Sequence, residues 1–154
     1  KDKDLYFGGQ ITHQRRQELA SAMQSMPNAL LRPTAGFAQG DKPEDYYRIL
    51  ASTRIAPAPS GAVVIDSFRF FEAIEMLCLP IGDKVDPKGN TVEFYKNLFG
   101  YDIPVSHVTN WFNIKKLVPE LLNQYPKNMH HVVAWWIKYK RDLSIKIMRQ
   151  VNAN

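Results

Sequence analysis

The sequence of 154 residues contains a single cysteine and no long apolar run. With Cys78 alone, an intrachain disulfide is impossible, and a metal cluster built from cysteines is excluded. No stretch of roughly 18 uncharged apolar residues occurs, and Lys1 rather than a methionine begins the chain, so we expect neither a signal peptide nor a membrane span. These absences predict no stable membrane insertion and favour a cytoplasmic location.

Common motifs for cofactors and metals are also missing. There is no Walker-type phosphate loop, and Gly8-Gly9 lacks the GxGxxG spacing of dinucleotide-binding folds. The histidines do not have the spacing of a zinc site, and no carboxylate completes an HExxH-like motif. We therefore predict no bound metal and no cofactor.

The composition is that of a globular protein. Apolar residues make up 45% and charged residues 23% of the chain. The length suits one domain over residues 1–154, able to bury roughly two-thirds of the surface that the unfolded chain exposes. Lysine and arginine number 20 against 15 acidic residues, which gives a net charge of +5. This charge suits an anionic ligand such as a nucleotide diphosphate, and equally nucleic acid or acidic lipid.

Short apolar segments alternate with segments of helical period. We expect strands at residues 5–7, 29–32, 54–56, 78–81 and 103–108. Helices are expected at residues 12–26, 41–53, 113–122 and 128–151, and in a segment that begins after Asp66 or Ser67. Thr12 is the predicted N-cap of the first helix.

The order of these elements predicts the fold class. Strands separated by helices form a parallel sheet, because each right-handed crossover returns its helix to the sheet. We therefore predict an α/β fold: a Rossmann-like, doubly wound parallel sheet with helices on both faces, followed by C-terminal helices. Residues 83–100 contain turn formers and a short helical piece near 93–98, which indicates an insertion between core elements.

Three loops at the expected carboxyl edge of the sheet are candidates for a ligand site. The first contains Gly8 and Gly9, where the backbone can approach a ligand closely. The second, over residues 57–65, contains Ser60 and Gly61 and leads into a capped helix. The third follows Ile81.

The helix after the second loop carries the chemistry. Unpaired amides at its N-terminus favour a diphosphate, and Ser67 and Arg69 would add a hydroxyl donor and a positive charge. Glu72, one turn later, would accept hydrogen bonds from ribose hydroxyls. The alternative is that Arg69 and Glu72, at i and i+3, form a solvent-facing ion pair, and the spacing alone does not decide.

The final predicted helix is basic and contains two tryptophans. Six cations lie between residues 127 and 149 against one acidic residue, Asp142. A solvated helix face is the ordinary explanation, and a non-enzymatic module that binds nucleic acid or an anionic membrane is the alternative. Trp135 and Trp136 are typical of packing residues, with a platform for nucleic-acid bases as the alternative.

Two ordered motifs resemble the exostosin-like glycosyltransferases. Residues 67–73 read SFRFFEA and are followed by Cys78-Leu79-Pro80-Ile81, similar to the family's SFRFxEA and C-[IVL]-P-[VI] pattern. Residues 103–111, IPVSHVTNW, are similar to its LPFSEVINW-type segment in the same order. The similarity extends over residues 5 to 150.

The resemblance implies a function for the whole chain. It implies a GT-B enzyme, in which a carboxyl-terminal Rossmann-like half binds a UDP-sugar. An amino-terminal domain, absent from this chain, would supply most of the carbohydrate acceptor site, so that this half alone would be inactive. Enzymes of this kind generally need no bound metal, which agrees with the lack of a DxD motif.

The resemblance also implies roles for single residues. Ser67 and Arg69 would hold the diphosphate and Glu72 the ribose, while Arg15 or Arg16 would add charge near the leaving group. The chain departs from the family at residues 58–61, where an arginine often precedes the glycine. It departs again at His107, where an acidic residue is usual. Both departures bear on sugar specificity.

Overall fold

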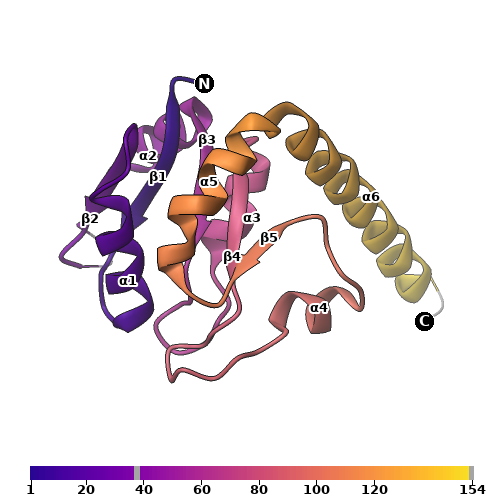
Figure 1. Ribbon diagram of the computed structural model, residues 1–154. Helices are drawn as coiled ribbons and strands as arrows, with labels where there is room; N and C mark the ends of the chain where they lie inside the picture. The colour runs from indigo at the N-terminus through magenta and orange to yellow at the C-terminus, as the bar shows by residue number, and fades with distance from the viewer. Residues whose placement is uncertain (37–38, 153–154) are drawn as a thin grey trace.

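A computed structural model describes residues 1–36 and 39–152 (Figure 1). Its five strands form a single sheet in the order β2-β1-β3-β4-β5, and every neighbouring pair is parallel. The strands are β1 (Lys3–Gly9), β2 (Ala29–Pro33), β3 (Thr53–Ala58), β4 (Leu79–Asp83) and β5 (Ser106–Val108). The helices are α1 (Gln14–Met23), α2 (Pro43–Ser52), α3 (Phe68–Glu75), α4 (Phe94–Phe99), the 3₁₀ helix η1 (Trp111–Asn113), α5 (Ile114–Asn123) and α6 (Tyr125–Val151).

Helices cover both faces of this sheet, which confirms the predicted doubly wound α/β fold. Helix α1 packs with η1 and α5, whereas α2 and α3 pack against β1, β3 and β4 (Figure 1). Successive side chains of β1 point to opposite faces of the sheet and contribute to two apolar cores. Leu5 and Phe7 belong to the larger core, and Tyr6 belongs to a second core with Leu50 and Cys78. Helix α6 contacts β4, α3 and α5, and its C-terminal part extends away from the sheet.

Several helix ends differ from the sequence expectations. The N-cap of α1 is His13 and not Thr12, and its side chain makes no capping bond. Ser67 is the N-cap of α3, as expected, but its side chain makes no capping bond either. Leu77 lies beyond the last residue of this helix, with φ of 55° and a half-exposed side chain.

The sheet divides between β1 and β3 at its carboxyl edge. Pairing between these two strands ends at Leu5 and Ile55, whereas β1 continues to pair with β2 as far as Gly9, and β3 with β4 as far as Ala58. Pro57, expected to begin a loop, is part of β3 and has no N–H to donate. The central strands therefore separate where the strand order reverses.

The insertion predicted at residues 83–100 forms a turn and the expected short helix. Val85 and Thr91 make an isolated antiparallel bridge, and α4 follows. Gly100 ends α4 in the left-handed conformation, with φ of 80°. No atom of residues 1–36 or 39–152 lies within 4 Å of the position that a Cβ atom on Gly100 would occupy, its chain neighbours aside.

We predict that Gly100→Ala lowers the free energy of unfolding by about 1–2 kcal/mol, because a left-handed φ is unfavourable for alanine even in open space. Gly40→Ala is the matched control. A Cβ atom there would make ordinary contact with Thr34 at 3.5 Å, and the backbone of Gly40 is not left-handed. Urea unfolding should therefore leave the control as stable as the wild type or slightly more stable. Equal losses in both variants would contradict the prediction.

Candidate functional site

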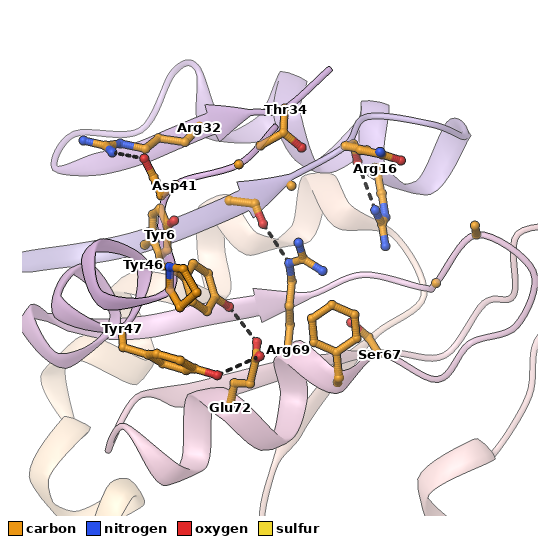
Figure 2. A pocket seen from close by; sticks show the side chains of 18 of the residues that line it. Tyr6, Arg16, Arg32, Thr34, Asp41, Tyr46, Tyr47, Ser67, Arg69 and Glu72 are labelled. Atoms are coloured by element: carbon orange, nitrogen blue, oxygen red, sulfur yellow. Dashed lines mark hydrogen bonds and ion pairs between the residues drawn. The ribbon is translucent and has the colours of Figure 1, made fainter. Parts of the chain in front are cut away.

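A cavity of about 370 Å³ opens at the carboxyl ends of β1 and β3, where the sheet divides (Figure 2). In doubly wound sheets of this strand order, ligands bind at this switch point. Six of the residues predicted from the sequence line the cavity: Gly8, Gly9, Gly61, Ser67, Arg69 and Glu72. Arg16, which was given as the alternative to Arg15, lines it as well. Among the lining residues that were not predicted as site residues are Tyr6, Arg32, Thr34, Asp41, Tyr46 and Tyr47.

Arg69 crosses the gap between β1 and β3. Its Nε atom donates a hydrogen bond of 2.7 Å to the carbonyl oxygen of Gly8, a group that β3 no longer pairs. The guanidinium also lies over the rings of Phe7 and Phe68, at 5.6 and 4.9 Å from their centroids. These contacts leave the outer guanidinium nitrogens facing the cavity (Figure 2).

Arg16 supplies a second cation from helix α1. Its side chain is buried, and it donates to the carbonyl oxygens of Ser60 and Gln10, both at 3.0 Å. Burial and, secondarily, the charge of Arg69 lower the pKa of Arg16 to about 10. Arg16 therefore remains cationic at neutral pH, in a setting that disfavours its charge.

Of the three arginines that line the cavity, Arg32 pairs with Asp41 at 2.7 Å, whereas Arg16 and Arg69 have no acidic counterpart among the described residues. Within residues 1–36 and 39–152, no carboxylate lies within 4.0 Å of the guanidinium of Arg16 or Arg69. Both instead donate to backbone carbonyl oxygens, which are neutral. Their positive charges thus make this end of the cavity suitable for an anion.

Arg15 and Ser60 were predicted as ligand contacts, and the structure places neither of them on the cavity wall. Both bind the carboxylate of Asp83, which ends β4 and has no exposed side-chain surface. Arg15 donates from two nitrogens to Asp83, at 2.7 and 3.3 Å, and from a third to Glu18 at 2.7 Å. The guanidinium that faces the cavity belongs to Arg16, the next residue along α1.

Asp83 accepts four further hydrogen bonds in this buried network. They come from the amide and hydroxyl of Ser60, both at 3.1 Å, from the amide of Val85 at 3.0 Å, and from Nε1 of Trp111 at 3.0 Å. The carbonyl oxygen of Ser60 in turn accepts from Arg16 and contacts a ring nitrogen of His13 at 3.0 Å. Asp83 therefore fixes the loop that holds Arg16.

Glu72 lies on α3 one turn after Arg69, beside two tyrosines of α2. Tyr46 donates to Oε2 of Glu72 at 2.8 Å, and Tyr47 donates to Oε1 at 3.4 Å (Figure 2). No ion pair between Arg69 and Glu72 is found in the part of the chain that the structure describes. The alternative interpretation of these two residues as a surface ion pair is therefore wrong.

Two glycines are required where the backbone lines the cavity. Gly9 has φ of 156°, and a Cβ atom there would lie 2.5 Å from a guanidinium nitrogen of Arg69. A Cβ atom on Gly61 would lie 2.6 Å from the carbonyl oxygen of Asp66, which is backbone and cannot move freely. These close approaches explain why the loops carry glycine.

His107 belongs to a separate, smaller cavity. It lies on β5 beside the buried Tyr95, at 5.0 Å between ring centroids, and lines a space of about 50 Å³. Burial is the main cause of its lowered pKa. The structure therefore does not bring His107 into the main cavity.

The basic face of α6 is partly neutralised within the chain. Lys138 and Arg141 pair with Asp142, and Lys140 pairs with Glu75. Trp135 packs edge-on against Phe99 and donates to Tyr101, while Trp136 packs against Phe71 and donates to Glu75. Both tryptophans are thus packing residues, as expected.

The described residues contain no helix that combines the length and the apolar character that crossing a bilayer requires. They contain no group of three or more histidine, cysteine, aspartate or glutamate side chains arranged to hold a metal ion.

Comparisons of the chain with protein-family models, with curated proteins and with solved structures gave no match.

We predict that Asp83→Asn destabilises the fold by about 3–5 kcal/mol, because Arg15 loses its fully buried counter-charge and keeps only the partly exposed carboxylate of Glu18. The asparagine amide also points donors at groups that are themselves donors. Asp142→Asn is the control, since this carboxylate is exposed and pairs with exposed cations on α6. Urea unfolding should show no measurable change for the control, and a similarly small change for Asp83→Asn would contradict this account.

Proposed function

We propose that this chain is the donor-binding half of a glycosyltransferase, which holds a nucleoside diphosphate sugar with UDP as the preferred nucleotide. The observation that carries the proposal is that Arg16 and Arg69 line the cavity without acidic partners among the described residues, and that the carboxylate of Glu72 lies one helical turn after Arg69. An anionic diphosphate suits the two cations, and a hydroxyl-rich ribose suits the carboxylate.

The diphosphate would lie against Arg16 and Arg69, near Gly8-Gly9 and the start of α3. The first amides of a helix have no intrahelical partner, and Phe68 and Arg69 of this first turn line the cavity. The positive end of the α3 helix dipole would favour phosphate oxygens. The cavity volume of about 370 Å³ lies within the range of small-molecule sites.

The proposed chemistry is transfer of the sugar to a hydroxyl of a carbohydrate acceptor. The bond between the anomeric carbon and the diphosphate oxygen breaks, a new bond to the acceptor oxygen forms, and the proton of the acceptor hydroxyl passes to a general base of the acceptor site. Arg16, Arg69 and the helix amides would stabilise the negative charge that develops on the leaving diphosphate. The resemblance to exostosin-like enzymes assigns the acceptor site to an amino-terminal domain, so we expect donor binding by this chain without turnover.

The alternative function, in which α6 binds nucleic acid or an anionic membrane, has weaker support. Three of the six basic side chains between residues 127 and 149 form ion pairs with Asp142 or Glu75. Both tryptophans of that helix pack against other parts of the chain. Arg16 and Arg69 in the cavity have no carboxylate partner among the described residues, although the third lining arginine, Arg32, pairs with Asp41.

We predict that UDP stabilises the protein in thermal unfolding and binds in calorimetry, and that Arg69→Ala weakens the affinity at least about tenfold. The reason is the loss of charge-assisted hydrogen bonds to phosphate. Arg48→Ala is the matched control, because Arg48 lies exposed on α2, pairs with Asp45 and does not line the cavity. The affinity of the Arg48→Ala variant for UDP should equal that of the wild type.

Two outcomes would contradict the proposed donor-binding function. One is the absence of any effect of UDP and of other nucleoside diphosphates on a folded wild-type protein. The other is equal weakening by Arg69→Ala and Arg48→Ala, since that would indicate non-specific attraction to a basic protein. Melting curves without nucleotide establish that each variant is folded.

A further inference from the structure

The carboxylate of Glu72 is held from one side by a pair of tyrosine hydroxyls. The donors are consecutive residues of α2, and each reaches a different oxygen: Tyr46 contacts Oε2 and Tyr47 contacts Oε1. The shorter bond comes from Tyr46, which is half-buried and packs against Tyr6 at 5.9 Å between ring centroids. The orientation of the carboxylate plane is therefore set by α2 and not by α3 alone.

Both hydroxyls act as donors at neutral pH. Burial, followed by the charge of Glu72, raises the pKa of Tyr46. The charge of Glu72 is the main cause of the raised pKa of Tyr47. Each tyrosine therefore keeps its proton, and the carboxylate is the acceptor in both bonds.

The carboxylate retains acceptor capacity toward the cavity. An ionised carboxylate has about four acceptor positions, and the tyrosines occupy one on each oxygen. Glu72 lines the cavity, and no cation of the described residues lies within 4.0 Å of it. What remains is one free acceptor position on each of two adjacent oxygens, which matches two donors on neighbouring carbon atoms.

We propose that Tyr46 and Tyr47 are positioning residues that fix Glu72 as a receptor for a vicinal diol, so that the site selects ribonucleotides over 2′-deoxyribonucleotides. This inference rests on the proposed function, because it takes the ligand to be a nucleotide. It adds that the discrimination depends on α2, through two residues that need not touch the ligand. A site that hydrogen-bonds a hydroxyl rejects an analogue without it, since its polar group is then left unpaired.

The test compares UDP with 2′-deoxy-UDP by calorimetry in the wild type and in hydroxyl-deletion variants. The wild type should bind UDP at least about tenfold more tightly than 2′-deoxy-UDP. Tyr46→Phe should reduce the ratio of these two affinities several-fold, mainly by lowering the affinity for UDP, because Glu72 is then held less firmly. Tyr47→Phe should have a smaller effect, in keeping with its longer bond of 3.4 Å.

The control is Tyr139→Phe, which removes a hydroxyl from α6, outside the cavity lining. This variant should keep the wild-type ratio. A purely structural role of Tyr46 would weaken both nucleotides equally and leave the ratio unchanged, and that result would overturn the inference.

The two proposals fail in different ways. Equal affinity of the wild type for UDP and 2′-deoxy-UDP would overturn the diol inference and leave the donor-binding function intact. Failure of the folded wild type to bind either nucleotide would overturn both.

Discussion

Asp83 is the one carboxylate on which the geometry of the cavity depends. It has no exposed side-chain surface, and it joins α1, the loop after β3, the end of β4 and η1 through Arg15, Ser60 and Trp111. A buried charge is tolerated only when it is paired and its acceptor positions are filled, and Asp83 meets both conditions. Because it fixes Ser60, whose carbonyl oxygen binds Arg16, the network sets the position of a cavity cation from outside the cavity.

The cavity itself follows from an interruption in the sheet. Pairing between β1 and β3 stops at Leu5 and Ile55, two residues before Pro57, and this leaves the carbonyl oxygen of Gly8 without a strand partner. Arg69 supplies the missing donor, so the same guanidinium completes the backbone of β1 and lines the cavity. The end of pairing between β1 and β3 therefore accounts for the position of a cation on the cavity wall.

The sequence was sufficient to predict the fold class and six of the residues that line the cavity, because both predictions rest on local patterns. Alternating strand and helix segments predict a doubly wound sheet, and glycines, a capped helix start and charges in its first turns mark the carboxyl edge. The role of Asp83 had no such local signal: in the sequence it follows the strand predicted at residues 78–81, next to turn formers, and Arg15 lies 68 residues away. Arg15 and Arg16 share one helix, and only tertiary contacts decide which one faces the cavity. Tyr46 and Tyr47 lie in the helix predicted at residues 41–53 and carry no local signal of their contacts with Glu72, which is 26 and 25 residues away.

Arg16 and Arg69 would also tie the stability of the chain to any anion that binds between them. The charge of Arg69 contributes to the lowered pKa of Arg16, so the folded state carries a repulsion that the unfolded chain lacks. An anion placed between the two cations offsets that repulsion and binds the native state alone. At a ligand concentration of 100 times Kd, such binding stabilises a protein by about 2.7 kcal/mol. The folded population of this domain would then rise and fall with the supply of its ligand, and proteolytic turnover would follow the same supply.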